Sequence, residues 1–306
     1  MFHVEHNFNN ILGSDLIKRS MTASVARGRI SHAYIICGEA GFGKRALAQS
    51  FAKAILCYAP TGGHACGICA SCKTFESGNN PDLVVIAPIK ASLGVDEMRD
   101  DIIANLSVLP FASSKRVYII EQAHKMTHPA QNAMLLSLED GPKHAVFLLL
   151  ANHLGAFLPT LLSRCISYKI PPLPQNAIEE HLRQRGISPE KAQIGAWFSG
   201  GGIGRALALA QDEDFMELRR MALELARSAA QMSIPEIFAA AKNLEEHKDN
   251  IHDFLDILKL HYRDELISTL CPRLLAKIRA IDDTKEKLAR NCPFLLCMEI
   301  LLLKLL

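Results

Sequence analysis

The sequence has almost no excess of charge of either sign. Its 34 Lys and Arg residues are balanced by 32 Asp and Glu residues, which leaves a formal net charge of +2 over 306 residues. A protein that wraps nucleic acid tightly by itself needs a strongly basic surface. The balance therefore argues against that class. A hydrophobic content of 49% is ample for buried cores, and the length predicts two or three domains.

The sequence also lacks the signals of export and membrane insertion. Residues 1–6 contain no basic segment followed by an apolar one, as a secretion signal requires. The strongly apolar stretch at 293–306 is too short for a membrane span and carries Glu299 and Lys304. We therefore expect a cytoplasmic protein with no membrane partner, in a reducing compartment where disulfides are disfavoured.

A phosphate-binding loop at 38–45 is complete except for its last hydroxyl. A predicted buried strand at 33–37 runs into it, and apolar residues at helical spacing follow. The last position calls for Ser or Thr, whose hydroxyl normally holds Mg²⁺, but here it is Arg45. A guanidinium has no lone pair for a metal. The positions that match are Gly38, Gly41, Gly43 and Lys44.

A second strand, predicted at 116–120, is followed by a second departure from the ATPase pattern. P-loop ATPases place an acidic residue at the end of such a strand to hold Mg²⁺, and Glu121 stands there. A further acid that activates water is expected next, but the chain has Gln122, whose amide cannot accept a proton from water. We therefore predict that ATP hydrolysis is lost. Nucleotide binding stays open, because Lys44 and the loop amides are retained.

Four closely spaced cysteines predict a structural zinc site. They follow the pattern C-x8-C-x2-C-x2-C, and the residues between them are small and favour turns. Four thiolates close the tetrahedral coordination of Zn²⁺ and leave no open position for catalysis. Spare cysteines are the alternative, and His64 is a possible substitute ligand. The predicted ligands are Cys57, Cys66, Cys69 and Cys72.

Together these features resemble one family, the AAA+ clamp-loader subunits of bacterial DNA polymerase III. The resemblance runs through most of the first 210 residues, and a Ser-Arg-Cys triplet together with a four-cysteine insert is specific to it. Within the family an intact P-loop marks the ATP-hydrolysing gamma/tau motors and a degenerate one marks delta-prime. Arg45 and Gln122 resemble the delta-prime pattern. The other matching segments are 31–34, 81–83, 95–99, 132–140 and 158–165.

The resemblance implies a stator that works through its neighbours. Arg164, in the triplet 163–165, is the candidate arginine finger, which acts in trans on ATP bound by an adjoining gamma/tau subunit. The implied partners are gamma/tau and delta subunits and, through the complex, the sliding clamp and primed DNA. Asn152 and Arg205 fall near the two sensor positions of the family and are expected to be structural relics.

The predicted fold class is α/β, with a mostly parallel sheet, a zinc module, a helical lid and an all-α C-terminal domain. Apolar strands alternate with helical stretches as far as a run of prolines at 171–174, which starts a linker. Beyond about residue 212 three amphipathic helices are predicted at 216–230, 234–247 and 250–269. The expected domains are 1–170, with the cysteine insert at 57–72, then 171–211 as the lid and 212–306 as the collar that the family uses to hold its ring.

Two other functions are compatible with the sequence. One is a working AAA+ ATPase of gamma/tau type that uses Glu121 in a rearranged metal site, and phosphate release by the purified chain would reveal it. The other is a zinc-dependent DNA-binding regulatory protein, which would give a salt-sensitive, sequence-selective shift of short duplexes.

Overall fold

A computed structural model describes residues 7–88, 92–95, 106, 108–139 and 141–306. The chain forms two compact units, Met1–Ala208 (the first unit) and Leu209–Leu306 (the second unit). Most of the segment at 95–99, and Asp140 at the end of the segment 132–140, lie outside the described residues.

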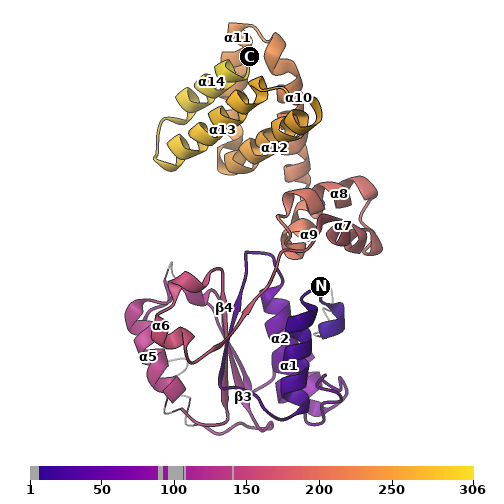
Figure 1. Ribbon diagram of the computed structural model, residues 1–306, viewed down its shortest axis with the longest axis vertical. Coiled ribbons are helices and arrows are strands. Elements are labelled where there is room, and N and C mark those ends of the chain that lie inside the picture. The colour runs from indigo at the N-terminus through magenta and orange to yellow at the C-terminus, as the bar shows by residue number, and fades with distance from the viewer. Residues whose placement is uncertain (1–6, 89–91, 96–105, 107, 140) are drawn as a thin grey trace. The chain divides into compact units, whose positions relative to one another are not determined.

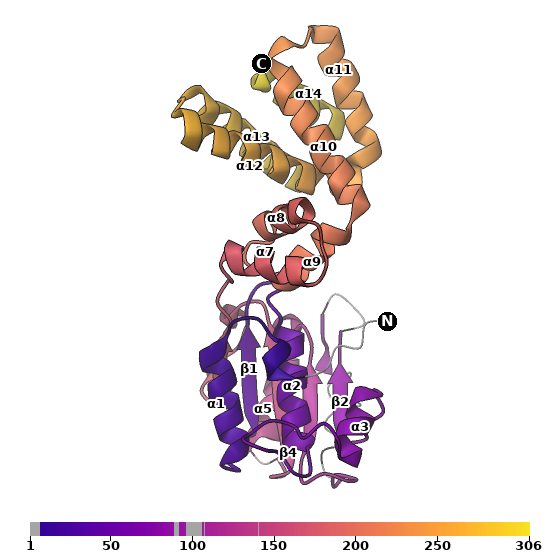
Figure 2. The same ribbon diagram turned by 90° about the vertical axis from the view of Figure 1, so that its right-hand side faces the viewer.

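The first unit is built on five parallel strands in the order β2-β3-β4-β1-β5. Figure 2 shows β1 and β2 at different places across this sheet. The strands predicted at 33–37 and 116–120 are present as β1 and β3, and together with β4 and β5 they confirm the α/β fold. The fifth, β2, was not predicted, because it is a four-residue strand at the edge of the sheet and is only partly buried. The strands are β1 (Ala33–Cys37), β2 (Leu83–Ile86), β3 (Arg116–Ile120), β4 (Ala145–Ala151) and β5 (Ile166–Lys169).

Helices cover both faces of this sheet (Figure 1). Tyr34 and Ile36 pack with α1 and α2, whereas Ile35 and Cys37 point to the opposite face and pack with α5 and α6. Because both faces are covered, β1 is buried along its whole length and reads as an uninterrupted apolar run. The elements are η1 (Phe8–Asn10), α1 (Asp15–Ala26), α2 (Lys44–Leu56), α3 (Ala70–Glu76), η3 (Ala123–Lys125), α5 (His128–Glu139), η4 (Leu154–Ala156) and α6 (Pro159–Leu162).

Three short helices follow the proline-rich linker, at the position of the predicted lid. They are α7 (Gln175–Gln184), α8 (Pro189–Phe198) and α9 (Ile203–Gln211). The first unit includes this segment as far as Ala208. A separate lid domain at 171–211 stays a prediction.

Every regular element of the second unit is a helix. Those at the start match the predicted segments closely, and the segment 234–247 is divided between an α-helix and a 3₁₀ helix. The helix α13 was not predicted, since its buried residues lie among many charged ones. The elements are α10 (Glu213–Ser228), η5 (Ala229–Gln231), α11 (Ile234–Asn243), η6 (Leu244–Asn250), α12 (Ile251–Thr269), α13 (Arg273–Ala289) and α14 (Phe294–Leu305).

The apolar C-terminal stretch forms α14, which packs within this unit on α11 and α13. Met298 and Leu301 are fully buried, but Leu296 and Leu303 are exposed, so the helix buries one face against its neighbours. Within the described part of the chain, no helix combines the length and the apolarity that crossing a bilayer demands.

Candidate nucleotide, metal and arginine-finger sites

The phosphate-binding loop lies between β1 and α2, at the carboxyl end of the sheet. Gly41 and Gly43 have φ angles of +80° and +85°, in the left-handed region where glycine is strongly favoured. Gly43 is also the residue that caps the start of α2. The glycines of the motif therefore shape a turn that directs backbone N–H groups and the start of a helix toward one point.

The ammonium of Lys44 bonds to acceptors of this same chain. Its Nζ donates to the backbone oxygens of Gly38 at 2.6 Å and Glu39 at 2.8 Å, and to Oδ1 of Asn152 at 3.0 Å. An ammonium has three donors, and these contacts use all of them. Burial lowers the pKa of Lys44, an effect that the nearby Cys37 and Glu39 partly oppose.

Arg45 and Glu121 form an ion pair. Nε of Arg45 lies 2.9 Å from Oε1 of Glu121, whose side chain is 18% exposed. This carboxylate oxygen is buried and accepts no hydrogen bond from the described residues, so the contact is an ionic one with unfavourable N–H direction. The two positions at which a P-loop ATPase holds its metal are thus occupied by a cation and an anion that neutralise each other.

Gln122 follows directly, at the start of η3, with a φ of +48°. Few residues other than glycine adopt this left-handed conformation. The backbone therefore makes a sharp turn at the position where a water-activating acid is expected. The amide of Gln122 has no basic group to offer there.

The two predicted sensor positions lie beside the loop. Asn152 follows β4 and contacts Lys44, as described above. Arg205 is at the start of α9, where the N–H of Gly204 donates to the backbone oxygen of Gly41 at 2.8 Å. A methyl group added to Gly41 would lie 2.7 Å from the backbone nitrogen of Arg205. The helix α9 and the P-loop therefore meet backbone to backbone, without room for a side chain.

Arg164 lies at the opposite end of the sheet. It comes two residues before β5, which runs parallel to β1 with Ile166 opposite Tyr34. In a parallel sheet the carboxyl ends of the strands share one edge, so the residue that precedes β5 is at the amino edge, away from the P-loop. Nη1 of Arg164 donates to the backbone oxygen of Thr160 at 3.0 Å, and Nη2 lies 2.5 Å from Oε1 of Glu139.

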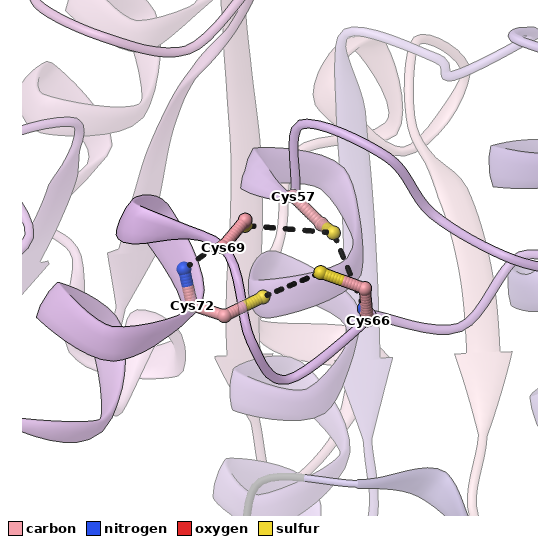
Figure 3. Close-up of side chains that lie close together, drawn as sticks. All are labelled: Cys57, Cys66, Cys69 and Cys72. Atoms are coloured by element: carbon pink, nitrogen blue, oxygen red, sulfur yellow. Dashed lines mark hydrogen bonds between the residues drawn. The ribbon is translucent and has the colours of Figure 1, made fainter.

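The four predicted zinc ligands come together in space (Figure 3). Their sulfur atoms all lie within 4.8 Å of one another, and two of the pairs are 4.0 Å apart. A tetrahedral zinc with Zn–S bonds of about 2.3 Å separates its sulfurs by roughly 3.8 Å, so the cluster fits that ion closely. His64 packs edge-on against Phe8 and is not part of the cluster. The sulfurs belong to Cys57, Cys66, Cys69 and Cys72.

Electrostatics divides these thiols into two pairs. Backbone N–H groups of Ile68 and Cys69 lower the pKa of Cys66 to about 6. Burial opposes ionisation of Cys69, but N–H groups of Tyr58 and Cys72 outweigh it and lower its pKa. Burial raises the pKa values of Cys57 and Cys72. Two thiols are therefore ready to ionise and two would ionise only beside a cation, which a divalent metal would supply.

A network of buried polar groups connects the cysteine module to the end of α2 and to the segment that precedes β2. Ser71 Oγ donates to the backbone oxygen of Leu56 at 2.8 Å, and Nδ2 of Asn80 donates to the backbone oxygen of Ser71 at 3.1 Å. The buried carboxylate of Asp82 accepts three backbone N–H groups, at 2.5, 2.9 and 2.7 Å, from residues 111–113. The sequence indicates no role for Asp82 or Glu139 beyond membership of a matching segment. Their partners, residues 111–113 and Arg164, are distant from them in the chain.

Comparison with known proteins gives consistent results. The profile of the family described as DNA polymerase III, delta subunit, matches residues 13–174. The delta' subunit of Bacillus subtilis (strain 168) is 31% identical over 246 residues, which are 79% of this chain and 74% of that protein. The delta' subunit of Escherichia coli (strain K12) is 30% identical over 84% of this chain and 79% of its own length.

Longer relatives and a solved structure match as well. The tau subunit of Bacillus subtilis (strain 168) is 27% identical over 94% of this chain, and the matched region spans 55% of that longer protein. A gamma subunit-related protein of DNA polymerase III from Thermotoga maritima has a crystal structure with a TM-score of 0.52 and 16% identity, covering 93% of this chain and 97% of that one. At that identity the structure supports the fold alone.

Proposed function

The chain belongs to the clamp-loader family of DNA polymerase III subunits, among the delta' subunits, and on that premise we propose that it is a non-hydrolysing stator. In this role it does not turn over ATP itself. It helps a complex with gamma/tau and delta subunits to load the sliding clamp onto primed DNA. Such work on chromosomal DNA belongs in the cytoplasm, so the proposal also assigns the chain to that compartment.

The ion pair between Arg45 and Glu121 carries the proposal. Magnesium bridges the β- and γ-phosphates in P-loop ATPases and is held by a hydroxyl of the loop and an acid of the second strand. Here a guanidinium stands where the hydroxyl is needed and already neutralises the acid. A metal ion approaching Glu121 would have to displace a cation, and the amide of Gln122 would still leave the attacking water without a base.

We propose further that Arg164 supplies an arginine finger to a neighbouring ATP site. Its position at the amino edge of the sheet is far from the chain's own P-loop, which is at the carboxyl edge. A finger in that position cannot serve its own loop without a large movement, but it can reach across a subunit boundary. Its planar cation would stabilise the charge that develops on the γ-phosphate.

The cysteine cluster is proposed to hold a structural zinc ion. Cys57, Cys66, Cys69 and Cys72 would all coordinate it and leave no open position for water. The metal would join the end of α2 to the start of α3 and so fix the loop between them. It takes no part in the proposed ATP chemistry.

Phosphate release tests the loss of hydrolysis. The purified chain with ATP and Mg²⁺ should release phosphate no faster than a buffer blank. The same chain assembled with gamma/tau and delta subunits should give a complex that hydrolyses ATP. Turnover by the chain alone at the rate of the assembled complex would refute the stator role and favour an active ATPase of gamma/tau type.

A further inference from the structure

We propose that Glu139 is a positioning residue for Arg164, holding the guanidinium in the orientation from which it serves a neighbouring subunit. This inference rests on the proposed function of Arg164 as a finger. Glu139 contacts Arg164, and the proposal routes its effect on ATP turnover through that side chain.

The two residues come from elements that the core fixes independently. Glu139 is the last residue of α5, and its neighbour Leu138 is buried. Arg164 follows α6, whose Leu161 is fully buried in the same core cluster. The backbones on both sides of the ion pair are therefore anchored, so the contact between the two side chains orients the guanidinium and not the loop.

The guanidinium is held from two directions. The backbone oxygen of Thr160 accepts from Nη1 at 3.0 Å, and Oε1 of Glu139 lies 2.5 Å from Nη2. A guanidinium has five N–H donors in a rigid fork, so these contacts leave donors for a phosphate. With 38% of the Arg164 side chain exposed, part of the group faces outward. An orientation fixed in advance spares the rotamer entropy that an unrestrained arginine would lose on meeting its ligand.

The position of Glu139 is electrostatically unfavourable for the helix that carries it. The carboxyl end of a helix bears partial negative charge, so a carboxylate in the last turn is disfavoured and a cation is preferred there. The side chain is also 43% exposed, and ion pairs between such groups contribute little to stability. A residue that breaks a local preference without a gain in stability indicates a functional requirement, and the guanidinium that it holds is the evident one.

The test measures ATP turnover, as a function of ATP concentration, by complexes of the full chain with gamma/tau and delta subunits. Glu139→Gln keeps the size of the side chain and removes its charge. We expect it to lower kcat at the adjoining site by about 5- to 10-fold, with KM unchanged. This factor corresponds to the entropy lost when one long side chain is immobilised. Glu139→Asp, which restores the carboxylate, should recover most of the loss. Glu179→Gln is the matched control, because it removes an ion pair of the same 2.5 Å length to Arg183 in α7.

The outcomes distinguish the positioning role of Glu139 from the finger role of Arg164 on which it depends. If Arg164→Ala has no effect on turnover, the finger itself is assigned wrongly. If Arg164→Ala lowers turnover while Glu139→Gln matches the parent chain or exceeds it, only the positioning role of Glu139 is overturned. Thermal unfolding of the isolated variants checks folding, and an equal loss in Glu139→Gln and Glu139→Asp would also count against the positioning role.

Discussion

The guanidinium of Arg45 stands 2.9 Å from the carboxylate of Glu121. In the sequence these residues are 76 positions apart and look like the remains of two separate elements, one altered and one retained. In the fold they are partners. Arg45 therefore does more than remove a hydroxyl from the P-loop. Its guanidinium also pairs with the carboxylate that could otherwise bind a metal.

Replacing Arg45 with Thr should make nucleotide binding depend on magnesium. The change supplies a hydroxyl, removes a positive charge that repels Mg²⁺, and frees Glu121. We expect Arg45→Thr to bind ATP at least about tenfold more tightly with Mg²⁺ than with a chelator, which is roughly 1.4 kcal/mol. Calorimetric titration measures it. Arg27→Thr, at an exposed position of the same unit, is the control. An Arg45→Thr variant that binds ATP equally tightly with and without Mg²⁺ would argue against this account of the ion pair.

The contact between α9 and the P-loop predicts different losses of stability for two similar glycines. Gly41 and Gly43 both have φ angles near +80° to +85°, so alanine strains either one by roughly 1–2 kcal/mol. A methyl group on Gly43 meets nothing within 4 Å, whereas one on Gly41 lies 2.7 Å from backbone of α9. Gly41→Ala should therefore destabilise the protein by at least about 1 kcal/mol more than Gly43→Ala. Equal midpoints in urea unfolding would show that the contact is absent in solution.

Removing ligands from the cysteine cluster should release a metal ion. The double variant Cys66→Ser and Cys69→Ser should lose one zinc ion per chain by elemental analysis and should unfold at a lower temperature, because metal binding contributes to folding. Cys292→Ser changes an exposed cysteine outside the cluster and should keep its zinc. A parent protein that contains no metal after purification without chelators would defeat the assignment.

Acid should also release the metal. The pKa of Cys66 is about 6 in the folded chain, so its thiolate is present at neutral pH and is protonated as the pH falls through that value. Because protons and zinc compete for the same sulfur, zinc affinity should fall with falling pH. A dye that binds free zinc should report no release at neutral pH and release only well below the pKa of the metal-free Cys66 thiol, because bound zinc keeps the thiolates ionised. Zinc retained even at a pH of about 2, where free thiols are fully protonated, would contradict a thiolate site.

Much of the fold could be predicted because it depends on local patterns. β1 and β4 are buried on both faces, so their apolar runs are continuous, and the four cysteines sit within one loop and the helix ends beside it. Contacts between distant segments could not be predicted. Glu139 meets Arg164, and Asp82 meets residues 111–113, only after the chain has folded. The helix α13 escaped prediction for another reason, since its charged residues conceal a narrow apolar face.

ATP turnover by the assembled complex, measured with Lys44→Ala and with Arg164→Ala in this chain, tests the central claim most directly. If the chain acts only through its neighbour, Lys44→Ala leaves turnover unchanged. Arg164→Ala then slows the adjoining site by about 1000-fold or more, the usual loss of an arginine finger, and removes that site's share of the total. A loss of turnover with Lys44→Ala and none with Arg164→Ala would show that the chain works as a motor.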